Sequence, residues 1–126
     1  MEKELLFKEE SYRIMGACFE VYREKGCGLL ESVCQECVEI EPEYRKIPFK
    51  GQPILAIQYR GRPLRSTFVP DLVCFDKIIV ELKAVSALCD HHRAQVFNCL
   101  KATGMKLGLI VNFGHYPKLQ SERIVI

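Results

Sequence analysis

Hydrophobic residues recur at helical spacing over the first 45 residues of the chain and alternate with polar residues after residue 50. This periodicity predicts a first helix from Lys3 to Lys25. Its predicted inward stripe consists of residues three or four apart: Tyr12, Met15, Cys18, Phe19 and Tyr22. The run Gly26-Cys27-Gly28 predicts the end of this helix, because glycine commonly follows a helix C-terminus.

A second helix is predicted to begin near Leu29. Its apolar stripe is expected at four positions: Leu30, Val33, Cys37 and Ile40. Pro42 is expected to end or kink this helix, because proline lacks an N–H group and its ring clashes with the preceding turn.

The second half of the chain alternates in the manner of strands. Extended segments are predicted over Lys50–Tyr59, Leu64–Val69, Asp71–Phe75, Ile78–Val85, Leu107–Phe113 and Arg123–Ile126, with a hairpin turn at Arg60–Pro63. A third helix is predicted from Asp90 to Thr103 and stopped by Gly104, with Ala94, Phe97 and Cys99 or Leu100 inward. This order predicts a mixed α/β (α+β) domain in which a helix crosses between strands.

Composition agrees with an ordinary soluble globular protein. The 126 residues are 48% hydrophobic and 27% charged, and we expect a single domain over residues 1–126. We find neither a signal-like start nor an apolar run long enough to span a membrane, and we expect a cytoplasmic protein with reduced thiols. The net charge of +2 does not by itself indicate nucleic acid, although a local basic patch would be sufficient for binding.

Three charged residues stand on two neighbouring apolar segments. Side chains of a strand alternate between faces, so Glu81 and Lys83 point the same way while Val80 and Leu82 point the other. Asp71 on the adjacent segment would complete a cluster of two carboxylates and one ammonium. Such a cluster suits a divalent cation and an attacking water, as in a metal-dependent phosphodiesterase. The alternatives are a plain turn residue at Asp71 after Pro70 and a solvated strand face.

Several further segments occur in a characteristic order: 28–33, 47–49, 80–85, 92–95, 100–104 and 107–114, with Asp71 and Asn98 between them. With these segments the chain resembles the GxxExxY proteins, a group within the PD-(D/E)XK nuclease superfamily. The resemblance covers nearly the whole chain and implies a restriction-endonuclease-like core, a mixed central sheet flanked by helices. The chain departs from the signature at one position, because the family's tyrosine is replaced by Cys34.

The resemblance implies a role for each site residue. Asp71 would be the principal metal ligand and Glu81 the second, with Mg²⁺ or Mn²⁺ as the ion. Lys83 would hold the attacking water and stabilise charge on the phosphate. Glu31 would be an additional acid and metal ligand, and Gln95 a polar helper on the third helix. The alternative roles are a helix-dipole partner for Glu31 and an ordinary surface position for Gln95, which shares a helix face with His92.

The implied partner is nucleic acid, with DNA as the expected substrate. A chain of this size is expected to act as a homodimer or within a complex. The residues that could contact phosphates are scattered: Arg60, Arg62, Arg65, His91, His92, Arg93, Lys101 and Lys106. They could equally form a solvated surface. Two competing interpretations stay open, a catalytically inactive nuclease-fold module and a zinc site built on Cys34 and Cys37 with Cys27 nearby.

Overall fold

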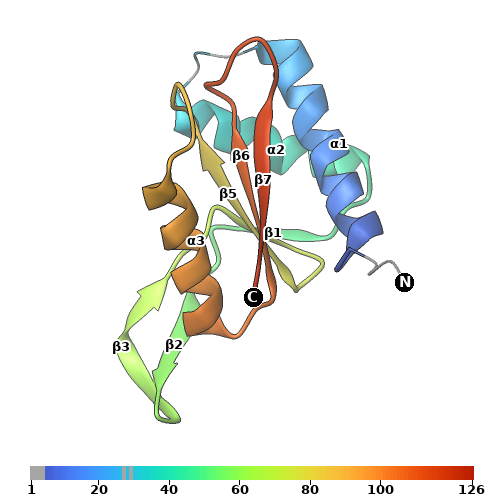
Figure 1. Cartoon of the computed structure of the whole chain (residues 1–126). Coiled ribbons are helices and arrows are strands. Elements are labelled where there is room, and N and C mark those ends of the chain that lie inside the picture. Colours follow the sequence, from blue (N-terminus) through green and yellow to red (C-terminus); the bar gives the residue numbers. More distant parts are fainter. Residues whose placement is uncertain (1–4, 27, 29) are drawn as a thin grey trace, which may run out of the picture.

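The computed structural model describes residues 5–26, 28 and 30–126 and contains three helices and seven strands in these ranges (Figure 1). In chain order they are α1 (Lys8–Lys25), α2 (Glu31–Tyr44), β1 (Phe49–Gly51), β2 (Leu55–Tyr59), β3 (Arg62–Phe68), β4 (Leu72–Cys74), β5 (Ile78–Lys83), α3 (Asp90–Thr103), β6 (Leu107–Asn112) and β7 (Gln120–Val125). Predictions that fall on residues 1–4, 27 and 29, including Cys27 and the expected helix start at Leu29, lie outside the described residues.

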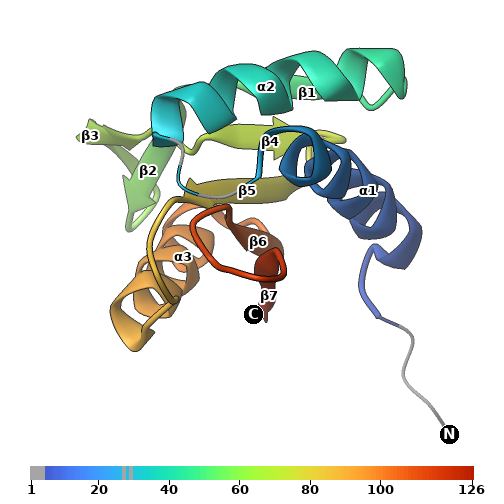
Figure 2. The same cartoon turned by 90° about the horizontal axis from the view of Figure 1, so that it is seen from above.

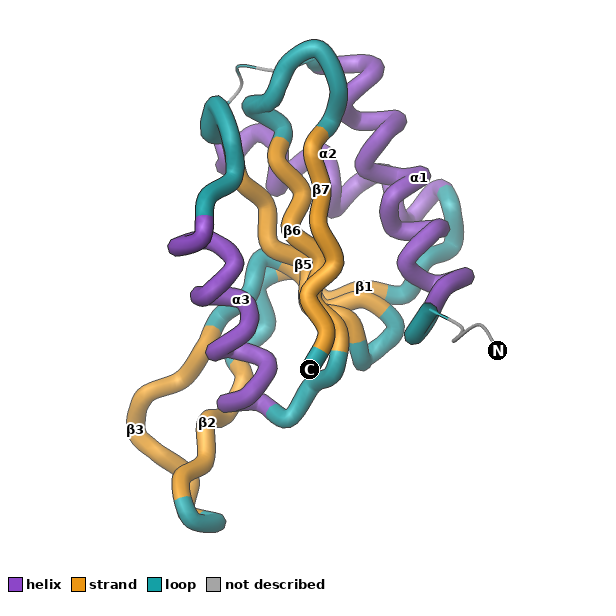
Figure 3. The backbone as a smooth tube through the Cα atoms, viewed as in Figure 1, coloured by secondary structure: helices purple, strands orange, loops and turns teal. Residues whose placement is uncertain are grey.

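Five strands form one mixed sheet in the order β1-β4-β5-β6-β7. β5 and β6 run parallel, and α3 makes the crossover between them, whereas every other neighbouring pair is antiparallel. This agrees with the expected α+β class and with the helix predicted to cross between strands. β2 and β3 form a separate two-stranded sheet that projects beyond the main one (Figure 3).

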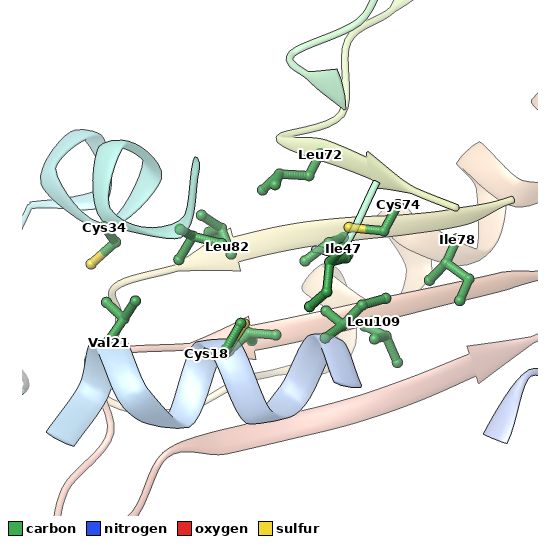
Figure 4. Packing of buried hydrophobic residues seen from close by; sticks show 14 of the residues in the cluster. Cys18, Val21, Cys34, Ile47, Leu72, Cys74, Ile78, Leu82 and Leu109 are labelled. Atoms are coloured by element: carbon green, nitrogen blue, oxygen red, sulfur yellow. The ribbon is translucent and has the colours of Figure 1, made fainter. Parts of the chain in front are cut away.

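The sheet is covered on both faces (Figure 2). α1 and α2 pack over one face, where Cys18, Val38 and Leu82 belong to the larger buried cluster. Figure 4 shows this cluster, with Cys34 of α2 beside Leu82 of β5. α3 packs over the other face, where Val96 and Leu100 meet Ile79 and Ile110. The central strands are therefore buried on both sides, which explains the continuous apolar sequence of β5 and β6.

The predicted inward stripe of the first helix is right at Cys18, which is buried, and at Met15 and Tyr22, which pack half-buried against the larger cluster, but it is wrong at two positions. Tyr12 is 80% exposed and Phe19 is 54% exposed. The buried positions of α1 are a different set: Ser11, Ile14, Ala17, Cys18 and Val21. These residues have the same helical spacing but are smaller; four of them belong to the larger buried cluster, and the Ser11 hydroxyl accepts from Arg123 of β7 at 2.8 Å. Periodicity alone could not choose between two stripes that share Cys18.

The predicted stripe of the second helix is also wrong at two positions, since Leu30 is 73% exposed and Ile40 is 55% exposed, whereas Cys37 packs half-buried against the larger cluster. Its buried positions are Cys34, Gln35, Val38 and Pro42. The helix continues through Pro42 to Tyr44, because Pro42 lies in the last turn. The Pro42 carbonyl oxygen accepts a hydrogen bond from the Ile47 N–H at 2.9 Å.

The third helix has its predicted bounds and ends at Gly104, whose φ of 79° is a left-handed conformation suited to glycine. Its inward residues are Val96 and Leu100, whereas Ala94 is exposed and Phe97 is 42% exposed. The last strand begins three residues earlier than predicted, at Gln120. None of the helices in the described ranges is long and apolar enough to cross a membrane.

Candidate metal centre

Asp71 and Glu81 meet where β4 and β5 separate. The ladder between these strands ends at the pair Leu72 and Val80. Beyond it, side chains replace the backbone partners. The Asp71 N–H donates to Glu81 Oε1 at 3.1 Å, and the Leu82 N–H donates to Asp71 Oδ2 at 2.7 Å. These reciprocal bonds hold the two carboxyl groups at one end of the strand pair.

The backbone of Asp71 is fixed from a second direction. Its carbonyl oxygen accepts from the Gln35 amide nitrogen at 2.8 Å and from the Gln52 N–H at 2.9 Å. The same Gln35 nitrogen donates to Glu39 at 2.7 Å. α2 and the segment after β1 therefore both position Asp71, and this limits the freedom of its side chain.

The two carboxyl groups are costly to ionise in this position. Burial raises the pKa of Asp71, and the nearby Glu31 adds to this, although the Leu82 N–H and Lys83 oppose it. Burial and then the Asp71 carboxylate raise the pKa of Glu81 to about 7, against the opposing Asp71 N–H and Lys83. Both carboxyl groups are difficult to ionise without a nearby positive charge. A bound cation would supply that charge and stabilise their ionised form.

Lys83 and Glu31 lie close enough to act on this pair electrostatically. Lys83 follows Glu81 by two residues on β5 and shares its face, which is also the face of Ile79 and α3. Glu31 is the first residue of α2 and is exposed. Its charge acts on both Asp71 and Glu81. Lys83 and Glu31 therefore act on the Asp71–Glu81 pair through their charges, and their roles as site residues stay predictions.

The donor set suits a hard cation that retains water. Asp71 and Glu81 present carboxylate oxygens, which Mg²⁺ and Mn²⁺ prefer, and a site of this kind needs only one or two carboxylates besides water and substrate oxygens. No three His, Cys, Asp or Glu side chains in the described ranges come together as a complete ligand set. The assignment of Glu31 as a direct ligand therefore stays a prediction.

No hydrogen bond or ion pair within the described residues connects Gln95 to the pair. Gln95 is exposed on α3 and makes no hydrogen bond or ion pair within the described part of the chain. Its proposed role stays a prediction. The neighbouring His92 accepts from the Cys89 N–H at 3.2 Å and thus caps the helix. Cys99, one turn after Gln95, is near enough to Glu81 for that charge to help burial raise its pKa to about 11.

Gln35 is the residue that sequence reasoning missed. It is 9% exposed and bonds both Asp71 and Glu39. A signal was present, because Glu31, Gln35 and Glu39 are spaced four residues apart and so share one face of a helix. That polar stripe faces the end of β4.

A second polar network supports the segment after β5. Asn112 is fully buried, and its Oδ1 accepts from the Val85 and Gly114 N–H groups, each at 3.0 Å. Its Nδ2 donates to the Val85 carbonyl and to Gln120 Oε1, each at 2.9 Å. These bonds fix the chain just past Lys83, and Asn112 therefore has a structural role.

Cys34 lies in the core, one turn after Glu31 on α2. It is 1% exposed, and burial raises the pKa of its thiol. Cys37 is half-buried on the same helix. No metal-binding group that contains either cysteine is found among the described residues, and Cys27 lies outside them.

Comparison with known proteins decides the family. A sequence model of the PD-(D/E)XK nuclease superfamily matches residues 8–124. The chain belongs to this superfamily. The helices and mixed sheet described above are consistent with the restriction-endonuclease-like fold of these proteins, which generally use divalent metals and act on nucleic acid.

A solved structure shows the same fold. The crystal structure of SSO0001 matches with a TM-score of 0.60 and 15% sequence identity, over 94% of this chain and 59% of that one. At this identity the likeness concerns the fold alone. The present chain spans about 59% of the length of SSO0001. No curated protein matches the sequence.

Proposed function

We propose that this PD-(D/E)XK protein is a nuclease of the GxxExxY group that hydrolyses phosphodiester bonds in DNA with Mg²⁺ or Mn²⁺. The observation that carries the proposal is the reciprocal pairing of Asp71 and Glu81. Two half-buried carboxyl groups are held together there by the N–H groups of Asp71 and Leu82. Placing two acids together in a half-buried position lowers the stability of the fold unless they bind a cation, so the arrangement favours a catalytic or metal-binding role.

The chain's own residues have distinct tasks in this proposal. Asp71 and Glu81 hold the ion and orient it relative to the scissile phosphate. Lys83, on the same face as Glu81, orients the attacking water and offsets charge that develops on the phosphate. Glu31 adds negative charge at the start of α2. When bound, the divalent ion supplies Lewis-acid activation of water and phosphate.

A catalytically inactive module that binds nucleic acid or a partner protein is the second candidate. The observation that favours it is the exposed position of Glu31, which is compatible with a helix-dipole role and leaves only two acids for the ion. The two candidates differ in a simple respect. A nuclease needs the ion for turnover, whereas a binding module retains its ligand without any ion.

Nicking of a supercoiled plasmid tests the proposal, with Mg²⁺, with Mn²⁺ and with chelator. Asp71→Asn is the test variant, because an amide oxygen can still accept from the Leu82 N–H while the charge is removed. Glu36→Gln, an exposed position on α2, is the matched control for removal of one negative charge. We expect metal-dependent nicking by the wild type and by Glu36→Gln but not by Asp71→Asn.

Calorimetric titration with Mn²⁺ completes the test. Saturable binding that Asp71→Asn abolishes, together with nicking, supports the nuclease. DNA binding with neither Mn²⁺ binding nor nicking would establish the inactive module instead. The proposed homodimer, which would bring two such sites together, is tested separately by sedimentation velocity.

A further inference from the structure

Positive charge is concentrated in the segment formed by β1 and the hairpin that follows it. Residues 49–70 contain four cations and no acid, which leaves 14 cations against 16 acids in the rest of the chain. Three of the four are arginines of the hairpin β2–β3: Arg60, Arg62 and Arg65. The fourth, Lys50, is 3.4 Å from Asp76. The hairpin is therefore the most basic element of a nearly neutral protein.

The hairpin arginines are available to a ligand. Arg62 and Arg65 are exposed, and within the described part of the chain neither forms an ion pair. Arg60 stacks over the Tyr59 ring at 6.0 Å from its centroid, and Tyr59 is itself 65% exposed. Six of the seven residues of β3 are exposed. Neither packing nor an acidic partner within the described chain explains this charge.

The base of the hairpin is anchored at the candidate metal centre. The Gln52 N–H donates to the Asp71 carbonyl at 2.9 Å, so the two ends of the segment close beside the carboxyl pair. Leu55 and Phe68, a cross-strand pair at the base, pack against the buried cluster under α3. The direction of the hairpin relative to Asp71 is thereby fixed, and Figure 3 shows it projecting away from the sheet.

The outer part of the hairpin is distorted on one strand. Ala56 pairs with Thr67 and Gln58 with Pro63, so that Ile57 alone lies opposite Leu64, Arg65 and Ser66. Extra residues of this kind bend a strand and increase its twist. Arg65 lies within the irregular stretch. From Leu55 to Tyr59 the ribbon extends about 17 Å at about 3.3 Å per residue, which equals the rise of about five base pairs.

We propose that the hairpin β2–β3 is an arm that enters the major groove of duplex DNA next to the scissile phosphate and contacts the backbone through Arg62 and Arg65. This inference rests on the proposed nuclease function. A two-stranded ribbon fits the major groove of B-form DNA, which is about 12 Å wide. The deep, narrow major groove of duplex RNA excludes it. The chemistry therefore favours duplex DNA over duplex RNA as the partner.

The test is equilibrium binding of a labelled 30-base-pair DNA duplex in EDTA, followed by fluorescence anisotropy at several salt concentrations. The test variant is Arg62→Gln/Arg65→Gln. Arg60 is left unchanged because its φ of 51° belongs to the tight turn. The control is Lys8→Gln/Lys25→Gln, which removes two exposed cations from α1, on the other side of the molecule in Figure 1.

We expect the test variant to bind at least tenfold more weakly at moderate salt. The slope of log K against log salt should fall in magnitude by about 1.8, at about 0.9 for each phosphate that the protein no longer neutralises. The control should leave the slope unchanged, and duplex RNA of the same sequence should bind the wild type more weakly than DNA. Equal slopes for the test variant and the wild type would overturn the proposal. The proposal would also be overturned if the wild type bound duplex RNA or single-stranded DNA as tightly as duplex DNA, or more tightly.

This binding result is independent of catalysis. If the wild type does not nick plasmid but the arginine pair carries DNA binding, the arm is supported and the nuclease is refuted. If the wild type nicks plasmid but the arginine and lysine double variants bind duplex DNA with the same affinity and salt dependence, the nuclease stands and the arm is refuted. Circular dichroism of each variant verifies that the fold is retained.

Discussion

Ionised Glu81 should destabilise the folded protein, and replacement by glutamine should relieve this. Its pKa is raised from 4.5 to about 7, chiefly by burial and then by Asp71. At about 1.4 kcal/mol per pH unit, this difference corresponds to an upper limit of about 3 kcal/mol. Glutamine has nearly the same shape and keeps an oxygen that can accept from the Asp71 N–H.

The sign of the pH dependence follows from proton binding. Between pH 4.5 and about 7 the folded state retains a proton on Glu81 that the unfolded state has released, so this contribution to stability falls as the pH rises. Above about pH 7 the carboxylate is ionised in both states, and the full cost of burying its charge remains. The gain from Glu81→Gln should therefore be small at pH 4.5 and largest at pH 8.

Urea unfolding in EDTA at pH 4.5, 6 and 8 measures this difference. Glu81→Gln should exceed the wild type by up to about 3 kcal/mol in unfolding free energy at pH 8, whereas Glu36→Gln should stay within about 0.5 kcal/mol at each pH. The difference between variant and wild type cancels the groups common to both proteins. A gain that is the same at pH 4.5 and pH 8 would refute the linkage to the carboxyl group.

Three further predictions concern the site and its support. Glu31→Gln should weaken Mn²⁺ binding in calorimetry without changing the circular dichroism spectrum, and an unchanged isotherm would return Glu31 to a helix-dipole role. Lys83→Ala should abolish plasmid nicking yet keep the rise in melting temperature caused by Mn²⁺, because it removes a cation from beside the cation's site. Residual metal-dependent nicking would exclude a catalytic role for Lys83. Gly108→Ala should lower the unfolding free energy by about 1–3 kcal/mol, since the added Cβ would lie 2.5 Å from Val96 Cγ1, and urea unfolding at the wild-type level would contradict this packing.

The strands and the acidic pair were predictable because their sequence signals are local. Alternation along Ile78–Lys83 separates Glu81 and Lys83 from Val80 and Leu82, and the structure keeps that division. The short turn at Asp76 then makes the antiparallel neighbour of β5 the strand that follows Asp71. Two residues ten apart in sequence thus come into contact through one tight connection.

The hairpin itself was predicted and is confirmed, but the buried helix faces and the separation of the hairpin from the main sheet were not predictable in the same way. α1 carries two stripes with helical spacing, and the larger side chains Tyr12 and Phe19 face outward while smaller ones pack inward. Which stripe is buried depends on how α1 packs against the sheet and α2, and the periodicity of α1 alone does not specify this. The sequence of the hairpin is that of two ordinary strands, and only the pairing of Gly51 with Leu72 shows that it lies outside the main sheet.

That pairing makes the hairpin a modular insertion in the fold. The chain leaves the sheet at Gly51 and returns opposite it at Leu72, with β1 and β4 already adjacent. A short turn could join those two strands without changing their register. The excursion can therefore lengthen, shorten or change charge between related proteins while the core and the acidic pair at its base stay intact. With the proposed roles, a change in what the hairpin binds is thus separable from the chemistry proposed for the acidic pair.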